Sequence, residues 1–146
     1  MKKQFSLAAF PYIPKLWATS VYFILLIVVF LLFMGRTNET LRFQPLLHLF
    51  PDFYSHVSNF SISFMVCLVS GYMGIMGTRK MKPTIFIGVL LMVANFIYEW
   101  FVSFLNIPDK TDAYYGFAGT FLPFIFFVFY RKWGLMKNPK FEKSKQ

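Results

Sequence analysis

Apolar residues gather along the chain into four long segments that are separated by short polar connections. The segments cover about residues 16–34, 56–76, 84–105 and 113–130. Each is about 20 residues long, which is the helical length that crosses roughly 30 Å of hydrocarbon. The pattern therefore predicts an all-α integral membrane protein. We expect one bundle of four transmembrane helices, formed by residues 1–136.

The first connection, residues 35–55, has an apolar pattern of its own. Apolar side chains recur in it at steps of three and four, at Phe43, Leu46, Leu47, Phe50 and Phe53. This spacing places them on one helical face. Pro45 suits the first turn of a helix, and Pro51 would end it. The connection therefore predicts a short amphipathic helix in the membrane interface, on the outer side.

The second segment carries a stripe of small or polar residues at helical spacing, from Ser63 through Cys67 to Gly77. Small residues let transmembrane backbones approach closely, so the stripe predicts helix packing. Pro123 predicts a kink in the fourth helix. The basic tail, residues 137–146, has no apolar pattern, and we expect it to be disordered.

The positive charge is distributed unevenly between the connections. The net charge is +9, and of 15 Lys and Arg only Arg36, Arg42 and Lys110 lie in the first and third connections. An excess of basic residues marks the cytoplasmic side of a membrane protein. We therefore expect a multi-pass protein of the bacterial cytoplasmic (inner) membrane with both termini cytoplasmic. The distribution indicates contact with anionic membrane lipids and argues against nucleic-acid binding.

The remaining composition narrows the chemistry. Hydrophobic residues make up 57% and aromatic residues 22% of the chain, which is too apolar for a soluble domain. One cysteine, Cys67, permits neither a disulfide within the chain nor a cysteine-based metal motif. No phosphate-binding loop or zinc-protease motif is present in the sequence. We expect no metal and no cofactor.

A carboxylate lies inside the third apolar segment. Glu99 is about six residues from the end of that segment, so it lies roughly 9 Å below the interface. A carboxylate at this depth costs on the order of 2 to 3 kcal/mol unless it is paired, protonated or hydrated. Asn95 falls on the same helical face one turn earlier, and His56 and Asn59 open the second segment at the same level. These residues are candidate ligand-binding groups.

The start of the fourth segment adds to this candidate site. Asp112 precedes the segment and is expected to be its N-cap, where a carboxylate accepts hydrogen bonds from free backbone amides. Polar groups from the starts of the second and fourth segments and from the end of the third can therefore converge on the outer side. Gly116 and Gly119 narrow the helix that follows, which leaves room for a ligand or for a neighbouring backbone.

Together, these residues resemble the VanZ-like family of small envelope membrane proteins. The similarity covers about residues 54–124 and is carried by His56–Phe60, Ile97–Trp100 and Asp112–Gly119. The chain departs from the family pattern at Val102, Gly116 and Pro123. The resemblance implies an envelope location and a link to low-level glycopeptide antibiotic resistance. It implies no particular reaction.

Four functions remain open from the sequence. The first is a non-enzymatic protein that binds an amphipathic ligand, such as a lipid-linked envelope precursor or a glycopeptide, at the outer leaflet. The second is a structural or accessory subunit of a larger membrane complex or of a homo-oligomer. The third is a membrane hydrolase or transferase with His56 as acid or base and Glu99 or Asp112 as its partner. The fourth is a proton-coupled transporter in which Glu99 titrates.

Overall fold

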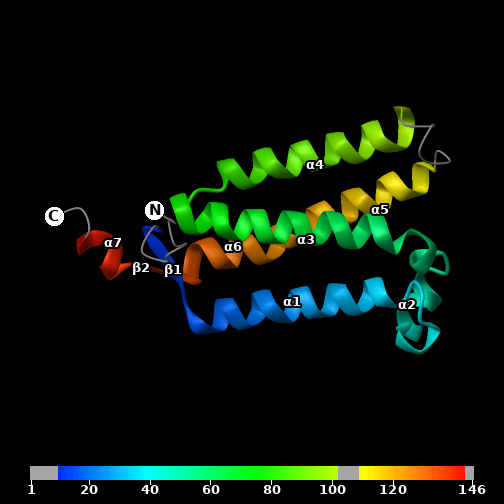
Figure 1. Ribbon diagram of the computed structural model, residues 1–146, viewed down its shortest axis with the longest axis horizontal. Helices are drawn as coiled ribbons and strands as arrows, with labels where there is room; N and C mark the ends of the chain where they lie inside the picture. The colour runs from blue at the N-terminus through cyan, green and yellow to red at the C-terminus, as the bar shows by residue number, and fades with distance from the viewer. Residues whose placement is uncertain (1–9, 102–108, 144–146) are drawn as a thin grey trace, which may run out of the picture.

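The structure is built mainly from long helices that lie side by side (Figure 1). The computed structural model describes residues 10–101 and 109–143, and of residues 99–101 and 143 only the backbone. The long helices are α1 (Leu16–Met34), α3 (Phe53–Thr78), α4 (Lys82–Phe101), α5 (Lys110–Phe121) and α6 (Pro123–Trp133). The short elements are β1 (Tyr12–Pro14), η2 (Glu39–Leu41), α2 (Gln44–Leu49), β2 (Leu135–Lys137) and α7 (Pro139–Lys143).

Three helical stretches are long and apolar enough to cross a membrane: α1, α3, and the stretch Lys110–Trp133 that joins α5 and α6. The described apolar part of α4, Lys82–Tyr98, is shorter than these three stretches. Only 11% of the residues in the apolar stretch of α1 are buried, so most of its apolar side chains face outward. A surface of this kind is rare on soluble monomers because it drives association in water. These features suggest a membrane protein.

Helix α3 is the centre of the bundle. It contacts α1, α4, α5 and α6, and Figure 1 shows α4 and α1 on opposite sides of it. The buried core follows α3 and the end of α6, with Val57, Phe60, Phe64, Cys67, Leu68, Ile75, Phe127 and Tyr130. Gly119 of α5 lies against the backbone of Phe60, where an added Cβ would come within 2.9 Å of the carbonyl carbon and closer still to its oxygen. Helices α3 and α5 therefore cross in backbone contact, as small residues allow.

The predicted helix bounds agree closely with the structure for the first helix and less closely for the others. Helix α1 has the predicted bounds, whereas α3 begins three residues before the predicted start at His56. The predicted end of the third helix, residue 105, lies outside the described residues. Leu122 keeps helical angles (φ −57°, ψ −39°), so the backbone continues from α5 into α6. Helix α2 contains Pro45 in its first turn and ends before Pro51, as predicted.

The all-α prediction is wrong in one detail, because a two-stranded antiparallel sheet joins the segments that flank the bundle. Strand β1 pairs with β2, with Tyr12 opposite Lys137. The two prolines of the segment before α1, Pro11 and Pro14, disfavour helix and leave this backbone extended. The sheet holds the start of α1 and the end of α6 at one end of the molecule (Figure 1).

The described part of the tail, residues 137–143, contains the end of β2 and the short helix α7. The side chain of Asn138 is buried and donates a hydrogen bond to the carbonyl oxygen of Phe10 (2.8 Å). The Asn138 side-chain oxygen accepts from the backbone amide of Lys140 (3.1 Å), which caps the start of α7. One polar side chain thus attaches the tail to the segment before α1.

Candidate functional site

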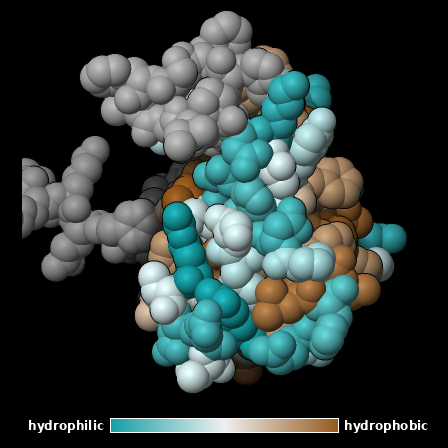
Figure 2. All heavy atoms as spheres, turned by 90° about the vertical axis from the view of Figure 1, so that its right-hand side faces the viewer, coloured by the Kyte–Doolittle hydropathy of each residue, from teal (hydrophilic) through white to brown (hydrophobic). Residues whose placement is uncertain are grey.

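Acidic and basic residues are distributed unevenly between the two ends of the bundle. The end formed by α2 and the starts of α3 and α5 carries Glu39, Asp52, Asp109 and Asp112, and we call it the acidic end. Seen end-on, it is covered largely by hydrophilic side chains (Figure 2). The opposite end contains the sheet and the turn between α3 and α4, and we call it the basic end. The sequence predicts this segregation of charge.

His56 and Asp112 join α3 to α5 at the acidic end. The Nδ1 atom of His56 lies 2.8 Å from Oδ1 of Asp112, at hydrogen-bond distance. Because an ionised carboxylate only accepts hydrogen bonds, Nδ1 carries the hydrogen in this pair. Two further carboxylate oxygens lie nearby, with Asp109 Oδ2 3.7 Å from Nδ1 and Asp52 Oδ2 3.9 Å from Nε2. The imidazole of His56 is therefore surrounded by three carboxylates.

The ring of His56 also has an aromatic partner on α5. It stacks on Tyr115, with ring centroids 5.3 Å apart and an angle of 13° between the planes. Tyr115 in turn packs edge-on against Phe53, at the start of α3 (5.6 Å, 69°). The side chain of His56 is 14% exposed. Its orientation is thus fixed by one hydrogen bond and one stacked ring, while part of the imidazole remains accessible to a ligand.

The predicted N-cap role of Asp112 is wrong, because α5 begins three residues earlier. Asp109 is the N-cap and accepts from the backbone amide of Thr111 (2.8 Å). This hydrogen bond is the main reason that the pKa of Asp109 is lowered, with smaller contributions from the Thr111 side chain and the charge of His56. Asp112 lies within the first turn, and its side chain is available to pair with His56.

His56, Asp109 and Asp112 are also the described residues that offer a potential metal-ligand set. One ligand atom from each lies within 4.8 Å of the other two. Zinc bonds of about 2.0 to 2.1 Å in a tetrahedron separate two ligand atoms by roughly 3.3 Å. The 2.8 Å between His56 and Asp112 is shorter and is that of a hydrogen bond. The spacing is therefore that of a hydrogen-bonded pair rather than of two zinc ligands.

A second polar contact joins three helices deeper in the bundle. The Nδ2 atom of Asn95, on α4, donates to the hydroxyl of buried Ser63 on α3 (2.9 Å). Gly116 of α5 faces the same amide, and an added Cβ there would lie 2.7 Å from Cγ of Asn95. Asn95 thus contacts both Ser63 and Gly116. No contact that the structure describes joins this group to His56.

The remaining predicted site residues lie as follows. The space beside Gly119 is filled by the backbone of Phe60, so the narrow face of α5 at this position accommodates α3. Asn59 is half-buried on α3, close to one turn after His56. Glu99 lies in the helical backbone of α4, and its side chain lies outside the described residues. The predicted pairing of Glu99 with His56 therefore stays a prediction.

An apolar groove of about 280 Å³ lies beside the His56 cluster. Helices α1, α2, α3 and α5 form it, through Leu32, Leu46, Phe50, Phe53, Phe60, Tyr115, Ala118 and Leu122. Tyr115 belongs to both places, since its ring stacks on His56 and also lines the groove. The polar cluster and the apolar groove are therefore contiguous.

Sequence reasoning missed four residues of this arrangement: Asp52, Asp109, Tyr115 and Ser63. Asp52 precedes His56 by four residues and Asp109 precedes Asp112 by three, so helical spacing contained a signal for both. The contacts of Tyr115 and Ser63 depend on how α5 and α4 are rotated about their axes, which the sequence does not give. Comparisons of the chain with protein-family models, curated proteins and solved structures found no match.

Proposed function

We propose that the protein is a multi-pass protein of the bacterial cytoplasmic membrane that binds an amphipathic ligand at the outer leaflet. In this proposal α4 is the fourth membrane-spanning helix. The acidic end faces outward, and the basic end, with both chain termini, faces the cytoplasm. The segregation of basic residues at one end supports this orientation.

The observation that carries the proposal is the position of Tyr115 between a polar cluster and an apolar groove. Ligand sites are typically apolar cavities of about 300 to 1,000 Å³ with a few convergent polar groups. The groove, at about 280 Å³, is just below this range. A volume of this size suits a segment of one acyl chain whose remainder stays in the bilayer.

The charges of the cluster indicate the chemistry of the head group. Asp52, Asp109 and Asp112 surround one imidazole, and ionised carboxylates can only accept hydrogen bonds. They favour a head group that donates, through hydroxyl or ammonium groups, and disfavour a phosphate. A lipid-linked sugar, an amine-bearing lipid or a glycopeptide fits this description. The resemblance to the VanZ-like family points to the same class of envelope ligands, and that family assignment remains part of the proposal.

The groove is tested by filling it. Ala118 is exposed and lines the groove, so Ala118→Trp adds bulk there without replacing a buried side chain. Ala94 is exposed on α4 and does not line the groove, which makes Ala94→Trp the matched control. Native mass spectrometry of protein purified from its own membranes in mild detergent measures the retained lipid-type ligand. We expect Ala118→Trp to lower retention about 10-fold, equivalent to about 1.4 kcal/mol, and Ala94→Trp to leave it unchanged.

The polar cluster is tested in the same experiment with His56→Gln and Asp112→Asn. Both substitutions keep a side chain of similar size, and Asp112→Asn removes one of the three charges around the imidazole. We expect each to lower retention of the same ligand that Ala118→Trp displaces. Retention that is unchanged in all three variants would contradict the proposed function.

A further inference from the structure

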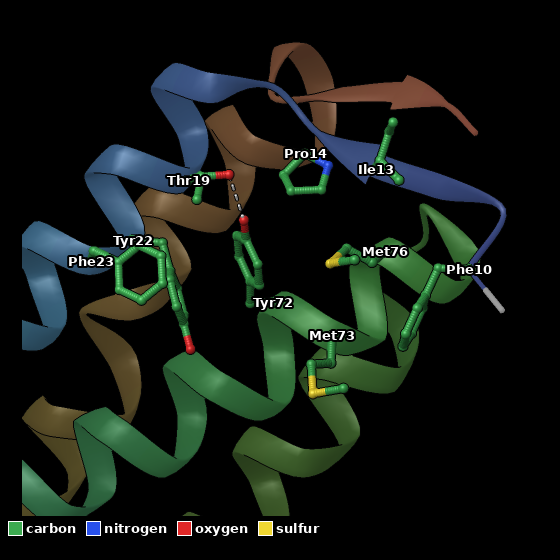
Figure 3. Close-up of a pocket in the computed structure, with 9 residues that line it drawn as sticks. All are labelled: Phe10, Ile13, Pro14, Thr19, Tyr22, Phe23, Tyr72, Met73 and Met76. Atoms are coloured by element: carbon green, nitrogen blue, oxygen red, sulfur yellow. Dashed lines mark hydrogen bonds between the residues drawn. The ribbon is translucent and has the colours of Figure 1, made fainter. Parts of the chain in front are cut away.

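An apolar cavity lies at the basic end, at the opposite end of the bundle from the site above. It has a volume of about 510 Å³ and lies between the start of α1, the last turns of α3 and β1 (Figure 3). Its lining is nearly all carbon and sulfur, with Phe10, Phe23, Met73 and Met76 among the side chains. A cavity of this composition suits a hydrocarbon chain. We call it the methionine cavity.

One wall of the methionine cavity is fixed by stacked tyrosines. The ring of Tyr72 lies between Tyr22 (centroids 4.2 Å apart) and Tyr130 (4.6 Å). Its hydroxyl meets that of Thr19 at 3.2 Å, so these two polar groups of the cavity bind each other (Figure 3). The wall therefore presents a rigid apolar surface, and its two hydroxyl groups already have each other as hydrogen-bond partners.

A basic hollow lies just beyond the end of α3, between the turn that leads into α4 and the end of α6. It has a volume of about 400 Å³ and is lined by Arg79, Lys80, Lys82 and Arg131, together with apolar Met81 and Ile85. Across the part of the chain that the structure describes, none of these four cations forms an ion pair. Four cations at a membrane boundary attract anionic lipid head groups.

Arg79 connects the hollow to the cavity. Its guanidinium lies over the ring of Tyr12 (5.7 Å), the residue before Ile13, which lines the methionine cavity. Its Nε also donates to the carbonyl oxygen of Arg131 (3.4 Å). Arg79 has a φ of 55°, a left-handed conformation that favours glycine.

We propose that the basic end binds one anionic phospholipid. Its phosphate lies in the basic hollow, and one of its acyl chains enters the methionine cavity. Two features indicate an intact lipid. The first is the positive charge of the hollow, and the second is the apolar cavity to which Arg79 connects it through Tyr12. The proposal concerns the opposite end of the bundle from the His56 cluster and does not depend on the function proposed for that cluster.

The test compares lipids that differ only in head-group charge. Dioleoyl phosphatidylglycerol, dioleoyl phosphatidylcholine or inorganic phosphate is added to the full chain in mild detergent, and native mass spectrometry measures occupancy. We expect the first lipid to bind at about 10-fold lower concentration than the second, with a preference that weakens as salt is added. Equal binding of the two lipids would overturn the proposal. Competition by inorganic phosphate as strong as that by the lipid would identify a free-anion site instead.

Variants separate the two halves of the site. Lys80→Gln with Lys82→Gln changes exposed side chains only, and we expect it to remove most of the preference for phosphatidylglycerol. Arg36→Gln, which removes a positive charge at the acidic end, is the control for a charge change elsewhere and leaves the preference intact. Met73→Trp fills the cavity from a side chain that is 39% exposed and weakens binding of both lipids. A preference that survives the double substitution, or binding unaffected by Met73→Trp, contradicts the proposal.

Discussion

Replacing Gly119 by alanine tests the packing that positions the acidic end. An added Cβ would lie 2.9 Å from the carbonyl carbon of Phe60. Ordinary van der Waals contact begins at 3.4 Å. Helices α3 and α5 must therefore separate by at least the difference, 0.5 Å, at this crossing. The obstacle is the backbone of a central helix, which no change of rotamer can move.

The magnitude follows from the contacts that the separation loosens. A radial gap of about 0.5 to 1 Å loses a quarter to a half of the dispersion energy of each contact pair. Overpacking of this kind typically costs about 1 to 3 kcal/mol. The better helix propensity of alanine offsets about 0.5 to 1 kcal/mol of this loss in stability. We expect a net loss of up to about 2.5 kcal/mol, or up to roughly 10 °C in melting temperature by the scale for soluble domains of this size.

The chain provides both the reporter and the control for this measurement. Cys67 is the one cysteine and is fully buried, so a fluorogenic maleimide reports unfolding in detergent as that thiol becomes exposed. Gly77 has no neighbouring atom within 4 Å of an added Cβ, and Gly77→Ala should leave the melting temperature unchanged or slightly raised. If Gly119→Ala melts at or above the temperature of Gly77→Ala, the close crossing of α3 and α5 is refuted.

Three further predictions use the same melting assay. His56→Ala and Asp112→Ala should show a coupling of about 1 to 2 kcal/mol in a double-mutant cycle, because each removes the same hydrogen bond; additive effects would contradict the pair. Ser63→Ala should destabilise the protein by about 0.6 to 1.7 kcal/mol through the lost contact with Asn95, and an unchanged melting temperature would argue against that contact. Because the folded pKa of Asp109 is depressed, its contribution to stability is present above the unfolded value of 3.8 and is lost as pH falls through the lower folded pKa. Asp109→Asn keeps a hydrogen-bond acceptor at the N-cap but cannot titrate. The melting temperature of this variant should therefore fall less than that of the wild type between pH 5 and pH 3. An equal fall in both proteins would contradict the role of the Asp109 carboxylate.

Hydrophobic runs predicted most of the helical architecture, because membrane-spanning length and turn residues are local signals. Helix α1 has the predicted bounds, and Pro45 and Pro51 frame α2 as expected. Pairing of β1 with β2 could not be predicted, because Tyr12 and its partner Lys137 are far apart in the sequence and neither strand has an alternating pattern. The hydrogen bond between Asn138 and Phe10 joins the same two segments and could not be predicted for the same reason.

The candidate site was predicted in part. Both His56 and Asp112 lie at helix starts on the same side of the predicted topology, so their meeting was among the alternatives. Two aspartates three residues apart, Asp109 and Asp112, could each cap α5, and the sequence does not show which one does. Gly119 was expected to leave space for a ligand or a backbone, and only the rotation of α5 against α3 decides that Phe60 fills it.

The most direct test of the central claim is photo-crosslinking in intact membranes with a lipid that carries a diazirine in its acyl chain. Peptide mass spectrometry then locates the label along the chain. We predict that the groove residues Leu46, Phe50, Ala118 and Leu122 carry more label than the exposed residues Val89 and Val93 of α4. We also predict that His56→Gln lowers the amount of label on the groove residues. Label spread evenly over all outward-facing apolar side chains, unchanged by His56→Gln, would contradict an amphipathic ligand held beside the His56 cluster.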